Sequence, residues 1–296
     1  MKPIKKLVIV ILGPTASGKT DLAIEIAEYF QLNIQNIDSR QIYIGMDIGT
    51  AKPTIDQQKR IQHCLIDICQ PNKPITLYDF KKQANLSLNK TLHQKGIGLL
   101  VGGSGLYLKA LTSGFEPPAV PPQAKLRNQL KEIGQAMCHQ LLKTCDPITA
   151  KKVAPADAVR TIRALEVFYA TGIPISSQQN MKPPAWNVLE LGLDPPDLDQ
   201  RIIGRTKTMY SNGLIEETQK LINEFGIDLP LLKTIGYKEA LDIIQGRISL
   251  SQAIELTNQR TKNFAKRQRT WFKKQHSPKW LNNQNPFKES IALIQG

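Results

Sequence analysis

The chain has 296 residues, of which 41% are hydrophobic, enough for one large core or two modest ones. Its net charge of +14 favours a polyanionic partner. The four cysteines form no CxxC pair, which argues against a zinc site or a disulfide framework, and no apolar run is long enough for a membrane span or a signal peptide. We therefore expect a cytoplasmic protein with reduced thiols and no membrane contact. We also expect it to be a monomer.

The first third of the chain alternates between apolar runs typical of buried strands and segments with helical spacing. The run Leu7–Leu12 ends in a glycine-rich turn, which indicates a buried strand, and Lys19–Phe30 has one apolar helical face. The alternation continues with a strand over Asn33–Ile37, a short strand over Leu65–Ile68, a helix over Asp79–Gln94 and a strand over Ile97–Val101. This order predicts a doubly wound parallel sheet.

Two proline-rich segments, residues 116–122 and 182–184, interrupt this pattern, because proline cannot continue a helix or a central strand. Between them, helices are expected over Lys125–Leu142 and Ala158–Ala170. Residues 117–183 are thus predicted to form a helical insertion between two parts of the α/β core, residues 1–116 and 184–296. After a strand at Val188–Leu193, helices are expected over Asp197–Asn212, Leu214–Phe225, Tyr237–Gln245 and Leu250–His276.

A phosphate-binding motif follows the first strand and opens the first helix, as the G-x-x-x-x-G-K-[ST] pattern of a P-loop requires. Its residues are Gly13, Pro14, Thr15, Ala16, Ser17, Gly18, Lys19 and Thr20. Backbone N–H groups and the helix N-terminus would bind a di- or triphosphate, Lys19 would neutralise it, and Thr20 would ligate Mg²⁺. The predicted fold is α/β: a P-loop doubly wound parallel sheet with a helical insertion domain and a helical C-terminal part.

Two further segments are expected beside the P-loop, because the carboxyl ends of parallel strands meet at one edge of the sheet. Asp38 follows the second strand and could be a base or acceptor for a second substrate, a Walker-type acid near Mg²⁺, or a helix N-cap. The small residues Gly102–Gly105 follow another strand and would allow close approach of a ligand, although an ordinary turn would look the same. That strand lacks a terminal acid, and Asp67 is the only other well-placed one, which weakens an ATPase interpretation.

The last long helix is strongly basic. No Asp or Glu lies between Glu255 and Glu289, and a stretch of one charge sign favours contact with nucleic acid. The cations there are Arg260, Lys262, Lys266, Arg267, Arg269, Lys273, Lys274, Lys279 and Lys288. The interleaved aromatic residues are Phe264, Trp271, Phe272 and Trp280, and we interpret them as core anchors rather than base-stacking platforms.

Together the motifs resemble the tRNA dimethylallyltransferases (tRNA isopentenyltransferases), especially their short bacterial form. The resemblance covers nearly the whole chain in the expected order. The most specific matches are NIDSRQIYIGMDIGTAKP at 36–53, LLVGGSGLYLKAL at 99–111 and AKRQRTWF at 265–272. Further matches are GPTASGKT at 13–20, HCLIDI at 63–68, RTIRALEVFYATG at 160–172, GLIEE at 213–217 and TIGYKEAL at 234–241.

The resemblance implies that the P-loop holds the diphosphate of dimethylallyl diphosphate and that the insertion clasps the anticodon stem-loop of tRNA. Asp38 would then lie at the N6 amine of adenine 37. The other residues expected to contact tRNA are Ser39, Arg40, Gln41, Ser104, Arg127, Arg160, Arg163, Lys266, Arg267 and Arg269. Two positions depart from the family: Ser104 stands where Thr is frequent, and Val159 where Gln often precedes the Arg160/Arg163 pair.

The expected chemistry is attack by N6 on the allylic carbon as the diphosphate leaves. Asp38 would orient N6 and take its proton, while the P-loop amides, Lys19 and Mg²⁺ on Thr20 stabilise the leaving group. Arg201 and Arg205, one turn apart, are candidates for closing over the diphosphate, with ordinary surface charge as the alternative. Three other functions stay open from the motifs: a P-loop kinase with Arg160 and Arg163 in its lid, an adenylate isopentenyltransferase and a non-catalytic RNA-binding protein.

Overall fold

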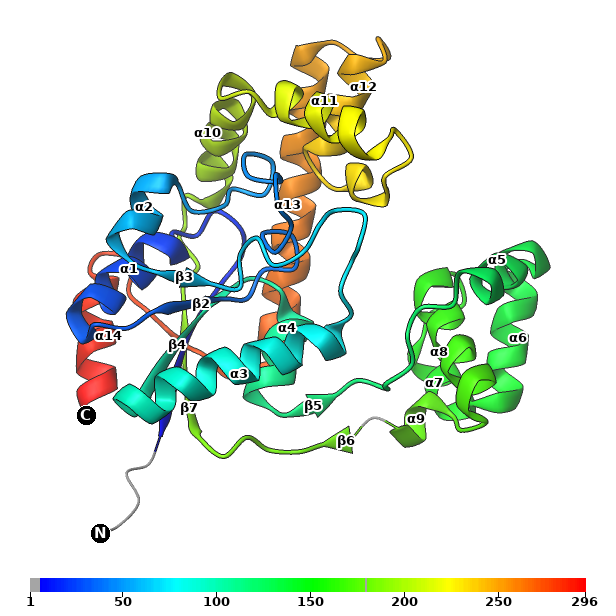
Figure 1. Cartoon of the computed structure of the whole chain (residues 1–296), viewed down its shortest axis with the longest axis horizontal. Coiled ribbons are helices and arrows are strands. Elements are labelled where there is room, and N and C mark those ends of the chain that lie inside the picture. Colours follow the sequence, from blue (N-terminus) through cyan, green and yellow to red (C-terminus); the bar gives the residue numbers. More distant parts are fainter. Residues whose placement is uncertain (1–5, 179) are drawn as a thin grey trace. The chain divides into compact units, whose positions relative to one another are not determined.

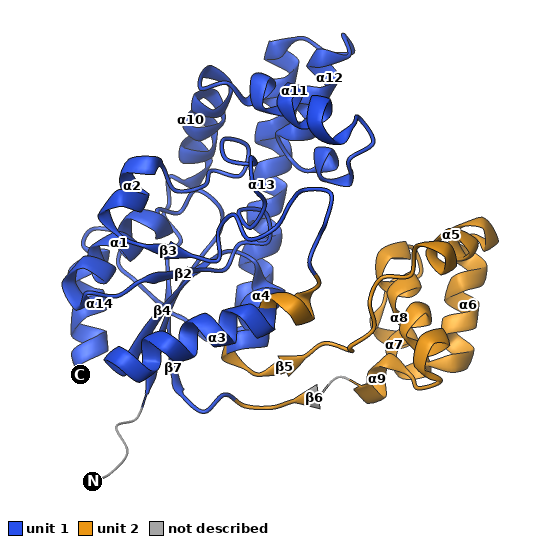
Figure 2. Ribbon diagram, in the orientation of Figure 1, with its two compact units in different colours: residues 1–75, 81–111, 184–296 blue, residues 76–80, 112–183 orange. Residues whose placement is uncertain are grey.

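The computed structural model describes residues 6–178 and 180–296. The chain forms two compact units (Figure 2). The larger contains the N-terminal part up to Ile75 together with Lys81–Leu111 and Pro184–Gly296, and the smaller contains Thr76–Phe80 and Thr112–Pro183. The smaller unit therefore begins before the expected start of the insertion at 117, at Thr112, which is the last residue of a helix.

The larger unit is built on a parallel sheet with the strand order β3-β2-β4-β1-β7-β8 (Figure 1). The strands are β1 (Leu7–Leu12), β2 (Ile34–Asn36), β3 (His63–Cys64), β4 (Ile97–Gly102), β7 (Asn187–Gly192) and β8 (Lys279–Trp280). In the register, Leu12 lies opposite both Gly102 and Gly192, and Asn36 lies opposite Val101. The carboxyl ends of four strands thus meet at one edge, which brings the segments after them together.

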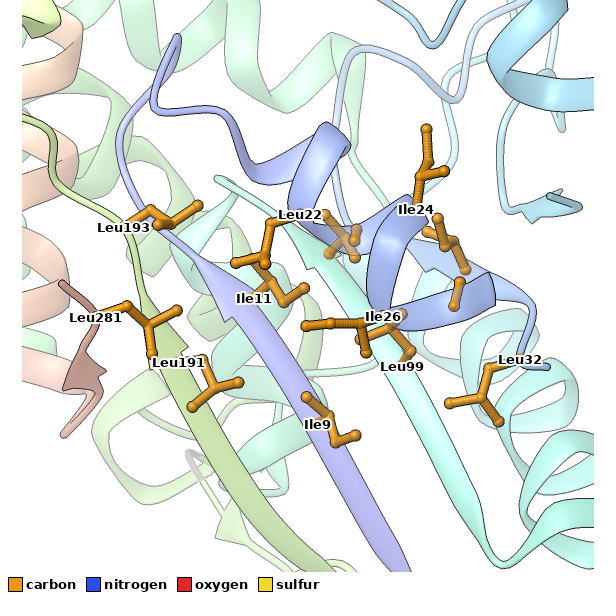
Figure 3. Close-up of a cluster of buried hydrophobic side chains, with 14 residues drawn as sticks. Ile9, Ile11, Leu22, Ile24, Ile26, Leu32, Leu99, Leu191, Leu193 and Leu281 are labelled. Atoms are coloured by element: carbon orange, nitrogen blue, oxygen red, sulfur yellow. The ribbon is translucent and has the colours of Figure 1, made fainter. Parts of the chain in front are cut away.

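Helices cover both faces of the sheet, which confirms the predicted α/β doubly wound fold. On one face, α1 (Lys19–Phe30) and α14 (Pro286–Gln295) pack over alternate strand residues such as Ile9, Leu99 and Leu191 (Figure 3). On the other face, α3 (Leu77–Lys95) approaches closely at Gly98, where an added Cβ would lie 2.5 Å from Leu88.

The C-terminal part of the larger unit is helical, as expected. It consists of α10 (Leu198–Ser211), α11 (Leu214–Phe225), the 3₁₀ turn η1 (Pro230–Lys233), α12 (Tyr237–Ile244) and the long α13 (Leu250–Gln275). The sequence patterns did not predict three shorter or terminal helices of this unit: α2 (Ile55–Arg60), α4 (Gly105–Thr112) and α14. The first of them begins at a capping box in which Thr54 and Gln57 exchange hydrogen bonds.

The smaller unit is a helical cluster reached through a two-stranded antiparallel ribbon, β5 (Phe115–Glu116) and β6 (Asn180–Met181). Its helices are α5 (Ala124–Ile133), α6 (Gln135–Cys145), α7 (Pro147–Lys152), α8 (Ala158–Thr171) and α9 (Ile175–Gln178). The helix predicted over Lys125–Leu142 is wrong in one respect, because Gly134 with φ 88° and ψ 153° divides it in two.

The strand predicted over Leu65–Ile68 is also wrong. The strand that pairs with β2 is two residues long and ends at Cys64. Leu65 and Asp67 have φ values of 64° and 51°, in the left-handed region, and this conformation cannot continue a ladder. The apolar pattern is instead explained by burial of Leu65 in a turn beside the sheet.

Candidate functional site

The P-loop connects β1 to α1 with the geometry of an anion-binding turn. Gly13 and Gly18 have positive φ values, and a Cβ at Gly13 would lie 2.2 Å from the carbonyl oxygen of Leu193, so no larger residue fits there. Gly18 is the N-cap of α1 and supplies no side-chain hydrogen bond. The first N–H groups of the helix are therefore available to an anion.

Three charged groups lie together at this turn. Lys19 Nζ donates to the carbonyl oxygen of Pro14 at 2.7 Å and contacts Ser17 Oγ at 3.4 Å. Burial and, to a smaller extent, the Arg205 guanidinium lower the pKa of Lys19 to about 7, against the opposing effect of the Asp38 carboxylate. Burial likewise lowers the pKa of Arg205 to about 10, again opposed by Asp38. The site therefore already holds excess positive charge, which an anion would relieve.

Thr15 of the P-loop is held by two helices of the C-terminal part. The Arg205 guanidinium on α10 hydrogen-bonds to its hydroxyl, and Gln268 Oε1 on α13 accepts its backbone N–H at 2.8 Å. The same Gln268 amide donates to the carbonyl oxygen of Gly103 at 2.9 Å and is buried. Gln268 thus joins the P-loop to the glycine-rich turn after β4. The sequence analysis missed this residue, because a single glutamine among cations carries no recognisable pattern.

Asp38 lies just beyond β2, where its Oδ1 accepts the backbone N–H of Arg40 at 2.8 Å. The residues after it form turns, not a helix, so the helix N-cap interpretation is wrong. The hydroxyl of Ser104 accepts the backbone N–H of Ser39 at 2.9 Å. The structure therefore brings the Asp38 and Gly102–Gly105 segments side by side, as the topology predicted.

Two cavities meet at these residues. The larger, about 940 Å³, is lined by the P-loop, Asp38, Arg201 and Asp67. The smaller, about 350 Å³, is lined by Ser39, Arg40, Ser104 and residues of α12 and α13. The residues that line both are Thr15, Asp38, Thr50, Arg205, Met209 and Phe264. Asp38 thus stands where a ligand on the P-loop could meet a second ligand.

A loop at residues 46–52 forms a further wall of both cavities, and the buried Glu217 of α11 anchors it. The Glu217 carboxylate accepts the backbone N–H groups of residues 47, 48 and 49 at 3.1, 2.8 and 3.1 Å and the Tyr237 hydroxyl at 2.5 Å. At the end of the loop, the buried Lys52 ammonium contacts Asp47 and Asp67, each at 2.5 Å. Asp67 therefore shares the Lys52 ammonium with Asp47.

The profile of the IPP transferase family matches residues 41–275. This chain belongs to the IPP transferase family. It is 61% identical to a tRNA dimethylallyltransferase of Prochlorococcus marinus, over 98% of this chain and 97% of that protein. It is 58% identical to a tRNA dimethylallyltransferase of Synechococcus, over 98% of this chain and 93% of that protein. The resemblance inferred from the motifs is confirmed.

Solved structures agree with this assignment. A tRNA isopentenylpyrophosphate transferase of Staphylococcus epidermidis is 33% identical, with a TM-score of 0.71, and 98% of this chain and 99% of that one are covered. A eukaryotic dimethylallyltransferase described as acting on tRNA is 25% identical, with a TM-score of 0.82, over 97% of this chain and 78% of that one.

The IPP transferase site places the two candidate arginines of α10 differently. Arg205 contacts the P-loop directly. Arg201 pairs with Asp197 at 2.9 Å, yet its guanidinium faces Gly18, where an added Cβ would lie 3.6 Å from Nη1. Both therefore line the larger cavity, and only Arg205 also lines the smaller one.

Of the residues expected to contact RNA in this family, several are already engaged within the protein. Gln41 Nε2 donates to the carbonyl oxygens of Thr50 and Ala51 at 3.1 and 2.9 Å, so it supports the loop at 46–52. Arg269 pairs with Asp194 at 2.7 Å, whereas Lys266 and Arg267 are exposed on α13.

In the smaller unit, Arg127 and Arg163 both pair with the fully buried carboxylate of Glu166 at 2.7 Å, and Arg160 pairs with Asp157 at the start of α8. Although burial disfavours the Glu166 carboxylate, hydrogen bonds from Arg127, the Gln123 backbone and Arg163 lower its pKa to about 2. Two predicted RNA contacts therefore also stabilise this unit.

The aromatic residues of the basic C-terminal region do not all behave as core anchors. Phe272 is fully buried, Trp271 packs against Gly105, and Trp280 covers Gly192. Phe264 and Trp280, in contrast, are 38% and 40% exposed, so the core interpretation is wrong for both. Of these two, Phe264 lines both cavities.

The site of this IPP transferase contains no ready-made metal centre. Within residues 6–178 and 180–296, no group of three or more His, Cys, Asp or Glu residues could hold a metal ion. Thr20, at the start of α1, lines the larger cavity.

Within residues 6–178 and 180–296, no helix is sufficiently long and apolar to cross a membrane.

Proposed function

We propose that this protein transfers the dimethylallyl group of dimethylallyl diphosphate to N6 of adenine 37 in tRNA, giving N6-dimethylallyladenosine and diphosphate. The observation that carries the proposal is the position of Asp38 at the junction of two cavities, one containing the P-loop. Relatives named as tRNA dimethylallyltransferases over nearly the whole chain support the choice of substrates.

The donor diphosphate would bind in the larger cavity. The P-loop amides and the N-terminus of α1 would hold its oxygens, with Lys19 and Arg205 supplying the charge and Arg201 closing over it. Because these groups are present before the diphosphate leaves, the protein stabilises the charge that develops on the leaving group. The relatives named as tRNA dimethylallyltransferases support a diphosphate ester rather than a nucleotide as the P-loop ligand.

The acceptor adenine would enter the smaller cavity, where Asp38, Ser39, Arg40 and Ser104 lie together. The N6 lone pair is delocalised into the ring and is a weak nucleophile. The Asp38 carboxylate would orient N6 toward the allylic carbon and take its proton as the C–N bond forms. The base must leave its stack to reach this position.

Mg²⁺ fits this site through Thr20 together with oxygens of the bound diphosphate, because hydroxyl and phosphate oxygens are the hard ligands that Mg²⁺ prefers. When bound, the ion would neutralise charge on the leaving group, and Thr20 would hold it.

The smaller unit, with Arg127, Arg160 and Arg163, would contact the anticodon stem-loop. We further propose that the protein acts as a cytoplasmic monomer.

One assay separates this function from its rivals. The protein is incubated with labelled dimethylallyl diphosphate or labelled ATP, each with AMP or unmodified tRNA as acceptor, and the products are resolved. We expect label in tRNA only from dimethylallyl diphosphate, and loss of that label when adenine 37 is replaced by guanine. Transfer to AMP would instead identify an adenylate isopentenyltransferase, transfer from ATP would identify a kinase, and binding of tRNA without any transfer would identify a passive binder.

A further inference from the structure

Phe264 occupies an unusual position for an aromatic residue of this chain. It lies on the cation-rich face of α13 and leaves 38% of its surface exposed. The ring lines both the P-loop cavity and the smaller cavity, a property that it shares with Asp38 and Arg205. An aromatic ring left partly exposed at the junction of two cavities offers an apolar face for a ligand to cover.

The backbone that carries Phe264 is held firmly. One turn further along α13, the buried Gln268 amide joins Thr15 of the P-loop to Gly103. Ala265, which directly follows Phe264 in the chain, packs with Leu198 and Ile202 of α10 against Ala16 of the P-loop. The ring is thus presented from a rigid helix, at a fixed place beside the phosphate site, as a stacking surface must be.

Two ligands could use such a ring: the positively charged allyl group during transfer, or a nucleobase. The Arg267 guanidinium already lies over the ring, 5.8 Å from its centroid. A second cation at the same ring would be repelled by Arg267, whereas a neutral base stacks on an aromatic face and tolerates a neighbouring arginine. The charge around Phe264 therefore favours the base.

We infer that Phe264 is the stacking platform for the acceptor adenine and fixes the plane in which N6 faces Asp38. This inference rests on the proposed function, since it assumes that the smaller cavity receives the base. It adds a residue that positions the acceptor rather than the donor. It also predicts that the aromatic character of the side chain, and not its volume alone, is required.

The test uses an anticodon stem-loop carrying 2-aminopurine in place of adenine 37. This base fluoresces, is quenched when it stacks, and lacks the amine that reacts, so the measurement reports placement of the base without turnover. In the complex with the parent protein we expect the base to stay quenched, because it leaves its stack in the RNA and stacks on Phe264 instead. We expect Phe264→Tyr to retain the quenching, Phe264→Leu to lose most of it, and the matched control Tyr29→Leu, an exposed aromatic that lines neither cavity, to behave like the parent.

Turnover of the unmodified stem-loop gives the second reading. Loss of one base–aromatic stack should raise the KM for the stem-loop by roughly five- to a hundred-fold in Phe264→Leu, with the KM for dimethylallyl diphosphate unchanged. Equal quenching and equal KM in Phe264→Leu and the parent would overturn the inference. A parent protein that binds no stem-loop at all would instead refute the proposed function, so the two failures are distinguishable.

Discussion

At the scale of single residues, the site depends on one carboxylate among cations. The Arg205 guanidinium lowers the pKa of Lys19, the Asp38 carboxylate raises the pKa of both cations, and burial makes each interaction stronger than it would be in water. In the free protein the Asp38 carboxylate offsets part of the positive charge. Once a diphosphate takes that role, Asp38 would be free to act on the proposed acceptor, which makes it the most informative residue to change.

Asp38→Asn keeps the size of the side chain and one acceptor oxygen but removes the basicity. We expect the single-turnover rate to fall by about two to four orders of magnitude, while binding of tRNA and of dimethylallyl diphosphate persists. A Mg²⁺ titration accompanies the measurement, because weakened Mg²⁺ dependence and poorer diphosphate binding would identify Asp38 as a metal ligand. The control is Asp56→Asn, an exposed residue of α2, which should react like the parent.

Lys19 makes diphosphate binding sensitive to pH. Because its pKa is about 7 in the free protein, the ammonium loses its proton as the pH rises above 7, and anion binding must then restore it. The affinity for inorganic diphosphate should therefore fall between pH 7 and pH 9, by at most about tenfold per pH unit. Isothermal titration of Lys19→Met should show weaker binding with a flatter profile. An unchanged slope would mean that the pH effect belongs to the ligand.

At the scale of elements, the loop at residues 46–52 has little regular structure of its own and is shaped by its anchors. Glu217 holds its backbone N–H groups, Tyr237 crowds Gly49 so closely that a Cβ there would lie 2.5 Å from the ring, and Lys52 fixes its end. A wall of both cavities is thus positioned by α11 and α12. These helices act on the site through the loop that they hold.

Glu217→Gln tests this anchoring. An amide offers one acceptor where the carboxylate offered two, and its NH₂ group would face backbone donors. Each buried donor left unpaired costs about 1–3 kcal/mol. We expect a lower midpoint of thermal unfolding and a higher KM for both substrates, with a smaller effect for Tyr237→Phe. The neighbouring exposed Glu216→Gln is the matched control, and a parent-like KM in Glu217→Gln would show that the loop keeps its shape unaided.

At the scale of the whole molecule, positive charge is abundant, but much of it is used internally. Arg127 and Arg163 neutralise the buried Glu166 of the smaller unit, and Arg269 neutralises Asp194 of the larger one. The charge available to a polyanion is thus smaller than the count of basic residues indicates. On α13 it lies mainly on exposed residues such as Lys266 and Arg267.

Neutralising Lys266 and Arg267 together should weaken tRNA binding and reduce its dependence on salt. Each lost phosphate contact lowers the slope of log K against log salt by about 0.7–0.9, because fewer counterions are released. Affinity for dimethylallyl diphosphate should stay the same. A charge-matched control, Lys220→Gln with Lys95→Gln, both exposed residues outside the basic stretch, should leave the slope near that of the parent. An unaltered slope in the first pair would show that this face of α13 does not meet the RNA.

The sequence by itself determined the fold class, the P-loop, the family and the closeness of Asp38 and Ser104 to the phosphate site. Each of these follows from local patterns. A strand followed by this glycine-rich motif and a helix forms a phosphate-binding loop, and the carboxyl ends of parallel strands meet at one edge of the sheet. The ends of the longer helices of the larger unit followed as well, whereas the helix expected over Lys125–Leu142 is divided at Gly134. The short strand at Leu65–Ile68 did not, since the apolar pattern of a buried turn looks the same.

Only the tertiary structure decided which side chains complete the site. Gln268 and Thr15 lie 253 positions apart, and Glu217 and Ile48 lie 169 apart, so no local pattern can pair them. The same holds for the choice of Arg205 as the arginine that contacts Thr15, for the depressed pKa of Lys19 and for the exposure of Phe264. Burial and charge at a point depend on every segment that packs there, and packing is a property of the whole fold.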